Sequence, residues 1–254
     1  MPLHHDDDHT LLHADDGTPL ARLRLRDDDG TPLADHVQPL PGAPLDRIAA
    51  QARHDLAGRR LHTPDAALAQ AVVDTGLRLR RAATDMRHHL ADLPAAPTLP
   101  DGWTIAPPGW DDDLATGLAA AYGPDHPDGS WQDSDTREIQ GMFDNGQPVP
   151  PLASAAARVV GPDGRSAGHV LVAGPVPWTE DECAWILNIG VAPHAQGRGL
   201  GWALLVHALH GTRAAGLPRL GLEVADANPA RRMYDRAGFQ VRTRALTIDL
   251  PPLA

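Results

Sequence analysis

The sequence predicts a mixed α/β fold, and two observations carry this prediction. Short apolar strand patterns alternate with amphipathic helix patterns along most of the chain, and one apolar strand runs directly into a glycine-rich turn that opens a helix. Apolar residues make up 42% of the 254 residues and charged residues 22%, which is ordinary for a globular protein. This length suffices for one large domain or two modest ones, each with a buried core.

Composition divides the chain into four segments. Residues 1–9 are polar and patternless, so we expect a disordered tail. Residues 10–93 carry a first set of strand and helix patterns, and the proline-rich stretch 94–102 is typical of a linker because proline cannot continue a helix. Residues 103–254 carry the second set, which includes the glycine-rich turn, and form the expected site-bearing domain.

The elements of residues 10–93 begin with three strand patterns separated by Asp-Gly steps, which favour hairpin turns. These strand patterns lie at Thr10–Ala14, Leu20–Arg26 and Pro32–Val37. Helical patterns at Leu45–Ala57 and Asp65–Thr75 precede an alternating run from Leu77 to Met86.

The second set alternates between strands and helices more regularly. Its strand patterns lie at Trp103–Ala106, Ala155–Val160, Ala167–Val172, Cys183–Val191, Leu220–Val224 and Phe239–Leu250. Its helical patterns lie at Asp111–Tyr122, Thr136–Asp144, Gly199–Ala215 and Pro229–Ala237.

Charge and cysteine content exclude several classes of protein. A net charge of −11 argues against a nucleic-acid or anionic-membrane partner. Cys183 is the only cysteine, so the chain has no internal disulfide and no thiolate zinc site, and we expect no metal. No apolar run is long enough to span a bilayer and no signal-peptide core is present, so a cytoplasmic protein is expected.

The glycine-rich turn at residues 196–201 has the properties of a pyrophosphate cradle. Glycines at 197, 199 and 201 remove side chains where the backbone must turn sharply or meet a ligand closely. The first amides of the following helix have no partner within the helix and lie at the positive end of its dipole. Arg198 can add a charge-assisted contact.

The turn is similar to two known types of phosphate-binding turn, of which the first is the dinucleotide-binding turn. A dinucleotide-binding turn has the spacing G-x-G-x-x-G and an acidic residue about 20 positions later, where Glu223 lies. The spacing here is G-x-G-x-G, however, and that motif normally opens its domain, whereas only about 50 residues follow this one.

The turn resembles motif A of the GNAT superfamily of N-acetyltransferases, Q/R-x-x-G-x-G/A, through Gln196, Gly199 and Gly201. The next segment, LGLEVADANPARRMYDRAGF (220–239), is similar to the family's motif B. The resemblance covers roughly Trp103 to Leu250. It implies a twisted mixed sheet flanked by helices, a split between two central strands, and acetyl-CoA as co-substrate lying in that split. A smaller, degenerate GNAT-like region would precede this catalytic domain.

The resemblance also implies residue roles. The backbone N–H of Val191 would stabilise the oxyanion or the thioester carbonyl, and Gly190 would mark a bulge or a close backbone approach at the split. Tyr234 would protonate the departing CoA sulfur, and Asn228 would bind the pantetheine arm. The predicted cofactor-binding residues are Ile189, Gly190, Val191, Gln196, Gly197, Arg198, Gly199, Leu200, Gly201 and Asn228.

The general base is a choice among carboxylates. Glu223 lies in the L-E-V strand, where some GNAT peptide N-terminal acetyltransferases carry a proposed base, and it is our candidate catalytic residue with Tyr234. Strand alternation places Glu223 opposite Leu222, but the sequence does not say which face meets the cleft. Other members use a glutamate on the preceding strand, where Trp185 stands here. Glu182, Asp181 and a water chain stay open.

The sequence gives only weak indications of the acceptor substrate. His169 on a central strand can line the acceptor cleft, and loop tryptophans at 110, 131 and 178 hint at an apolar or aromatic acceptor. The predicted partner is a small-molecule or peptide amine, with a homodimer also possible for the chain.

Residues 64–90 align with the end of the chain so that Gly76 falls opposite Gly238, which favours a degenerate duplication. Ala66 stands where Asn228 would be, and Val72 where Tyr234 would be. The chain is thus similar to tandem GNAT proteins, mycothiol synthase among them. Three functions follow: an acetyl-CoA-dependent N-acetyltransferase acting by direct amine attack, a mycothiol-synthase-like tandem acetyltransferase, and a non-catalytic CoA-binding protein.

Overall fold

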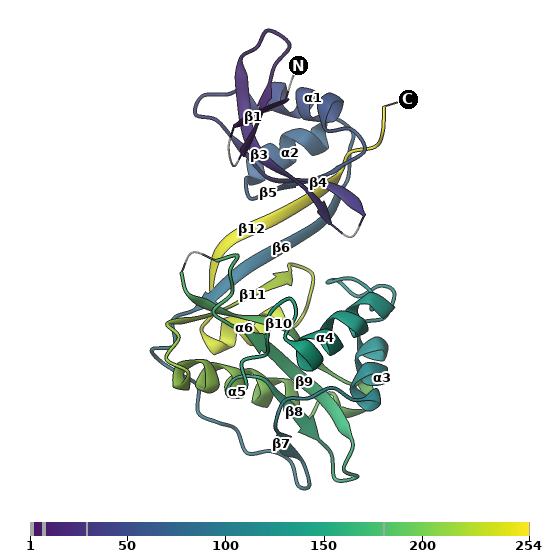
Figure 1. Ribbon diagram of the computed structural model, residues 1–254, viewed down its shortest axis with the longest axis vertical. Coiled ribbons are helices and arrows are strands. Elements are labelled where there is room, and N and C mark those ends of the chain that lie inside the picture. The colour runs from purple at the N-terminus through teal and green to yellow at the C-terminus, as the bar shows by residue number, and fades with distance from the viewer. Residues whose placement is uncertain (1–2, 7–8, 29, 180, 254) are drawn as a thin grey trace. The chain divides into compact units, whose positions relative to one another are not determined.

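The computed structural model describes residues 3–6, 9–28, 30–179 and 181–253, and it is a mixed α/β protein as the sequence predicted (Figure 1). The chain forms two compact units. The N-terminal unit comprises Met1–Asp85 with Arg242–Ala254, and the C-terminal unit comprises Met86–Val241.

These units differ from the predicted division at residues 94–102. The last strand, β12 (Gln240–Asp249), runs into the N-terminal unit, where it pairs antiparallel with β5 (Arg60–Thr63). Leu61 and Ile248 are opposite one another in this pairing, and both are fully buried. The C-terminal unit in turn takes up residues 86–88 of β6 (Leu79–His88). The N-terminal unit is therefore completed by a strand from the end of the sequence.

The N-terminal unit has the strand order β1-β2-β3-β4-β5-β12. Strand β1 forms where the sequence predicted a disordered tail, and it pairs with β2; residues 1–2 and 7–8 of that tail lie outside the described residues. The two predicted Asp-Gly hairpins join β2 to β3 and β3 to β4, with residue 29 of the second turn outside the described residues. The remaining elements are β1 (Leu3–Asp6), β2 (His9–His13), β3 (Pro19–Asp28), β4 (Thr31–Pro39), α1 (Leu45–Asp55) and α2 (Ala66–Asp74).

Helices α1 and α2 close the core of this unit. Asp65 caps α2 by accepting hydrogen bonds from the backbone N–H groups of Ala67 and Leu68, both at 2.9 Å, which satisfies two of the donors left open at a helix start. Ile48 of α1 and Leu68 of α2 are fully buried against the sheet. Strand β5 was missed in the sequence because it is only four residues long, RLHT, and Leu61 is its one apolar residue.

The C-terminal unit has the strand order β6-β11-β10-β9-β8-β7 and contains the predicted catalytic elements. Its strands are β7 (Thr104–Ala106), β8 (Ala157–Val160), β9 (Ser166–Ala173), β10 (Cys183–Val191) and β11 (Arg219–Ala225). Its helices are α3 (Asp112–Ala121), α4 (Asp133–Asn145), η1 (Pro193–Ala195), α5 (Leu200–Ala214) and α6 (Arg231–Ala237).

Alternation along β9 assigns the two faces of this sheet. Val170 and Val172 pack with α5, whereas Leu171 packs with Ile139 and Met142 of α4. Helices α5 and α4 therefore cover opposite faces. Within the described part of the chain, every helix is too short or too polar to cross a membrane.

Candidate active site

Strands β10 and β11 separate part-way along their length. Their parallel pairing joins Cys183–Trp185 to Arg219–Gly221, after which β10 continues to Val191 and β11 to Ala225. Between the described residues of the two strands the pairing stops at Trp185. The later parts of both strands consequently present backbone groups toward a shared opening, as predicted for a split sheet.

The backbone of Val191 is directed into this opening. Strand β10 pairs antiparallel with β9, with Val191 opposite Gly168, and the next amide, of Ala192, donates to the Ala167 carbonyl at 2.8 Å. Because hydrogen-bonded and non-bonded pairs alternate in an antiparallel ladder, the N–H and C=O of Val191 point away from β9. The Val191 carbonyl accepts a hydrogen bond from Nε2 of Gln196 at 2.9 Å, which anchors the glycine-rich turn to the end of β10.

The turn itself depends on two left-handed glycines. Gly197 has φ 75° and Gly199, the N-cap of α5, has φ 77°, which is a region that residues with a Cβ enter only with strain. Space beside both glycines is open, because a Cβ at either would meet no atom within 4 Å. Gly201, in the first turn of α5, would place its Cβ 3.8 Å from Met233 and 3.9 Å from Val191. The turn thus exposes the amides at the start of α5.

A cavity of about 490 Å³ lies over this turn. Helix α6 contributes two exposed arginines, Arg232 and Arg236, and the guanidinium of Arg236 stacks on the Trp202 ring at 4.4 Å from its centroid. Positive side chains and a helix N-terminus together favour an anionic ligand. The residues lining the cavity are Val191, Ala195, Gln196, Gly197, Gly199, Leu200, Gly201, Trp202, Pro229, Arg232, Met233 and Arg236.

The predicted cofactor set and this lining overlap but are not identical. Of the described residues around the cavity, Arg198 is not among the lining side chains, and neither are Ile189, Gly190 and Asn228. Arg198 is exposed. The sequence analysis did not single out Arg232 and Arg236 as the positive residues at the cavity. The N-P-A-R-R run at 228–232, whose arginines begin α6, was the available signal for Arg232.

Gly190 lies at a close approach, but to a helix of this protein. A Cβ at Gly190 would lie 2.5 Å from Cδ2 of Leu118 in α3 and 3.4 Å from the Tyr122 ring. The bulge in β10 falls earlier, between Ile186 and Asn188, and not at Gly190. The Ile189 carbonyl accepts a hydrogen bond from the Tyr122 hydroxyl at 3.2 Å.

Asn228 connects β11 to the loop between α3 and α4. Its Oδ1 accepts from the backbone N–H of Ala230 at 2.8 Å, and its Nδ2 donates to Oδ2 of Asp128. The other oxygen of Asp128 accepts from the backbone N–H of Ala225 at 2.6 Å. Asn228 therefore shapes the turn before α6, and Asp128, which the sequence did not single out, holds both ends of that turn.

Tyr234 lies in α6 and is only 5% exposed. Its ring packs edge-on against Phe239, with centroids 5.9 Å apart. Burial raises the pKa of the Tyr234 hydroxyl above its ordinary value, and nearby Tyr122 and Asp128 raise it further. The hydroxyl is accordingly protonated at neutral pH, as a proton donor must be.

The structure resolves which face of β11 carries Glu223. Leu222 and Val224 are buried in the core beneath α5, so Glu223 is on the opposite face and is exposed. Gly221, on the same face as Glu223, would place its Cβ 2.8 Å from the Trp185 ring. Glu223 and Trp185 therefore share the sheet face that α4 covers elsewhere.

The other carboxylates have different surroundings. Asp181 is ion-paired with Arg87 at 3.5 Å and Arg219 at 3.4 Å, and its side chain is 13% exposed. Such pairing fits a structural role for Asp181. Glu182 is exposed and has φ 50°.

A buried polar network links β9, β10 and α3. His169 Nε2 is 2.8 Å from Oδ1 of Asn188, and Asn188 Nδ2 donates to the Tyr122 hydroxyl at 3.2 Å. Burial lowers the pKa of His169 to about 4 and raises that of Tyr122 to about 12, so both are neutral at physiological pH. Asn188 is a polar residue in an apolar strand, a signal that the sequence offered and that our prediction passed over.

Two of the three loop tryptophans frame this network. Trp110 stacks on Trp131 with centroids 6.4 Å apart and 12° between the planes, and it lies 5.8 Å from the His169 ring. Tyr122 lies 5.6 Å from Trp131. Trp178, by contrast, is 51% exposed. The aromatic residues and His169 thus form one wall on the face opposite α5.

Comparison of the sequence with known proteins finds a matching family model and similar proteins. Residues 116–239 match the model of the acetyltransferase (GNAT) family. A protein of Thermomonospora curvata named mycothiol acetyltransferase is 35% identical over 199 residues, which is 74% of this chain and 61% of that protein. The chain thus spans less than two thirds of that relative's length.

Solved structures share the fold over nearly the whole chain. A GCN5-related N-acetyltransferase from Sphaerobacter thermophilus superposes with a TM-score of 0.66 at 19% identity, covering 99% of this chain and 84% of that chain. A tandem GNAT protein from the clavulanic acid biosynthesis pathway superposes with a TM-score of 0.56 at 17% identity, covering 97% of this chain and 83% of its own.

Proposed function

The chain contains an acetyltransferase domain of the GNAT family, and from this premise we propose that it transfers an acetyl group from acetyl-CoA to a primary amine by direct attack. The observation that carries the proposal is the cavity at the start of α5, which adjoins the open end of β10. Anionic phosphates fit the amides of the turn and the side chains of Arg232 and Arg236. The thioester end then belongs at the split between β10 and β11.

Three groups of this chain would act on the reacting atoms. The N–H of Val191, which points away from β9, would hydrogen-bond the developing oxyanion. The protonated hydroxyl of Tyr234 would donate to the departing sulfur. Glu223, exposed on the face of Trp185, would remove a proton from the attacking ammonium, directly or through water.

An acceptor screen tests this function. Purified protein is mixed with acetyl-CoA and single primary amines (amino acids, amino sugars, aminoglycosides and short peptides), and released thiol is followed. Acetyl-CoA-dependent thiol release with at least one acceptor supports the proposal. Tight CoA binding without transfer to any amine would instead favour a CoA-binding protein without activity.

Replacing Arg236 by Gln tests the cofactor end of the site. Loss of one charge-assisted contact to phosphate is worth about 1.5 kcal/mol, so the KM for acetyl-CoA should rise about tenfold while kcat changes little. Arg213→Gln is the matched control, because Arg213 is exposed at the other end of α5. Equal KM values for the two variants would contradict the placement of phosphates beside Arg236.

Replacing Glu223 by Gln tests the base. We expect kcat/KM at neutral pH to fall about a hundredfold, because general bases contribute about 10²–10⁴-fold. The loss should shrink as the pH rises, since more of the amine is then unprotonated in solution. Glu182→Gln is the comparison, and a larger loss for Glu182→Gln than for Glu223→Gln would transfer the role to Glu182.

The N-terminal unit is, in this proposal, a degenerate copy of the catalytic fold. Helix α1 joins the parallel strands β4 and β5, just as α5 joins the parallel strands β10 and β11. Helix α1 begins after Pro44, without a glycine-rich turn. The copy would contribute strands and not a second cofactor site.

A second candidate function is the one that the Thermomonospora curvata relative's name describes, that of a mycothiol acetyltransferase. It is favoured by the 35% identity and by the tandem arrangement proposed here. Adding mycothiol-related amines to the acceptor screen tests it, because this function predicts thiol release with those acceptors and with none of the other amines.

A further inference from the structure

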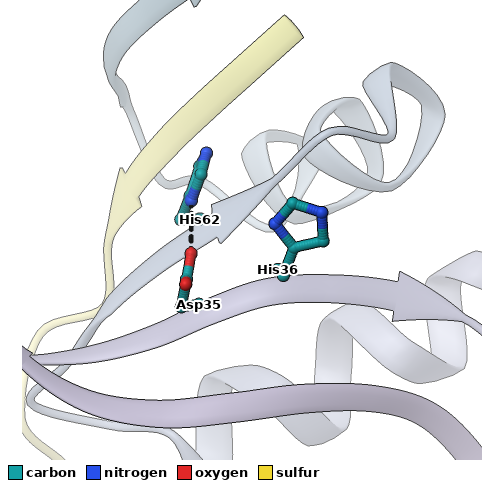
Figure 2. Close-up of side chains that lie close together, drawn as sticks. All are labelled: Asp35, His36 and His62. Carbon is teal, nitrogen blue, oxygen red and sulfur yellow. Dashed lines mark hydrogen bonds and ion pairs between the residues drawn. The ribbon is translucent and has the colours of Figure 1, made fainter. Parts of the chain in front are cut away.

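Three metal-ligating side chains gather in the N-terminal unit, far in sequence from the acetyltransferase motifs. One ligand atom each from Asp35, His36 and His62 lies within 4.8 Å of the others. Figure 2 shows Asp35 and His36 leaving β4 on the side where His62 of β5 lies. The rings of His36 and His62 are 6.1 Å apart and nearly perpendicular.

A register shift in strand β4 brings the side chains of Asp35 and His36 close to each other. Neighbouring residues of a regular strand point to opposite faces, so Asp35 and His36 would normally diverge. The register between β3 and β4 shifts here: Arg22 is opposite Gln38 but Arg24 is opposite Asp35, which places one extra residue in β4. Bulges of this kind re-aim a side chain and occur next to functional sites.

The backbone of His36 also adopts an uncommon conformation. His36 has φ 55°, in the left-handed region that disfavours residues with a Cβ. Conformations of this kind cost about 1–3 kcal/mol and concentrate at sites where they orient a functional group. The strand therefore keeps a histidine where glycine or asparagine would fit more easily.

The donor set of the three side chains suits a metal ion. The cluster offers one carboxylate and two imidazoles, and Asp35 is buried while His36 is exposed.

The surroundings provide access from solvent and an outer-shell partner. The exposed His36 provides access from solvent, and Nε2 of His62 has no hydrogen-bond partner among the described residues. Arg26 binds Oδ2 of Asp35 at 3.1 Å, which orients the carboxylate and leaves Oδ1 for a ligand. Oδ1 is now 2.6 Å from Nδ1 of His62, so an ion bound between them would displace their shared proton.

We propose that Asp35, His36 and His62 form a binding site for a divalent transition metal such as Zn²⁺, with one coordination position open to solvent. Two imidazoles and one carboxylate are a donor set that Zn²⁺ and its neighbours prefer, whereas Mg²⁺ and Ca²⁺ prefer oxygen ligands throughout. The site lies outside the proposed acetyltransferase machinery and changes the sequence-based expectation of no metal. Binding stabilises the strand pair β4–β5 of the N-terminal unit.

The test is metal binding by the full chain, measured without reference to activity. Zn²⁺ is titrated by calorimetry, and Co²⁺ is followed through the visible absorption of its protein complex. His4 and His5 are first replaced by Gln, because the N-terminal histidines can bind metal themselves. In this background we expect one ion per chain, release of protons on binding, and a thermal unfolding midpoint that rises with Zn²⁺ but not with Mg²⁺.

The decisive variant is His36→Asn. Asparagine tolerates a positive φ and His36 is exposed, so the fold should be retained while one imidazole ligand is lost. We expect Zn²⁺ affinity to fall at least tenfold and the cobalt absorption to disappear. His54→Asn is the matched control, because His54 is an exposed histidine of the same unit. Absence of binding in the background protein, or equal affinity in the His36 and His54 variants, overturns the proposal.

Discussion

Tyr234→Phe should lower kcat for acetyl transfer about a thousandfold while leaving CoA affinity within twofold of the unchanged protein. The substitution removes only the hydroxyl, and general acid catalysis contributes about 10²–10⁴-fold to a rate. Phe fills the same space beside Phe239, and the aromatic packing of α6 is kept. The measurements are steady-state turnover and CoA binding by calorimetry on the same preparations.

The other tyrosine provides the control. Tyr122 is the only other tyrosine of the chain, it is likewise buried with a raised pKa, and its hydroxyl bonds Ile189 and Asn188. Tyr122→Phe should cost about 1 kcal/mol of unfolding free energy, because two hydrogen bonds lose a partner, and lower kcat less than tenfold. A Tyr234→Phe enzyme with normal kcat would remove the tyrosine from the proton-donor role and leave the sulfur to solvent.

Local sequence patterns were sufficient for most elements of the fold, with strands β1 and β5 as the exceptions. Strand β10 was predicted with its observed bounds because its apolar run ends shortly before a glycine-rich turn, which marks where the strand stops. Positive φ values at Gly197 and Gly199 are what the G-x-G spacing demands. Strand bounds and turn conformations, which depend on neighbouring residues, can thus be predicted from the sequence.

The domain boundary, the positive residues at the cavity and the face of Glu223 depend on long-range packing, and local sequence patterns did not predict them. The pairing of β12 with β5 joins residues that are nearly 200 positions apart, and no change in composition marks it, so the predicted domain boundary was wrong for 242–254. Arg198 was chosen for its place in the turn, whereas Arg232 and Arg236 reach the cavity because α6 packs beside the start of α5. The face of Glu223 likewise depended on which side of β11 is covered by α5.

The position of α5 under the sheet rests on a glycine that no motif includes. Gly211 lies in the last turn of α5, and a Cβ there would fall 1.9 Å from the carbonyl oxygen of Ser154 and 2.6 Å from Cα of Ala155. Both contacts are with backbone atoms of the segment that leads into β8, and such atoms cannot rotate away as a side-chain end can. The helix therefore reaches its depth against β8 only without a side chain at 211.

Gly211→Ala should consequently destabilise the protein by about 3 kcal/mol, although alanine is the better helix former by about 1 kcal/mol. Gly141 of α4 is the matched control, because a Cβ there would meet only the Gln147 carbonyl oxygen, at an ordinary 3.7 Å. Gly141→Ala should leave stability unchanged or raise it by up to about 1 kcal/mol, so the same substitution in two helices has opposite signs. Chemical denaturation of the two variants measures both effects. A stabilised Gly211→Ala protein would mean that α5 can lift from β8, and because α5 carries the amides of the glycine-rich turn, CoA affinity would then have to fall with it.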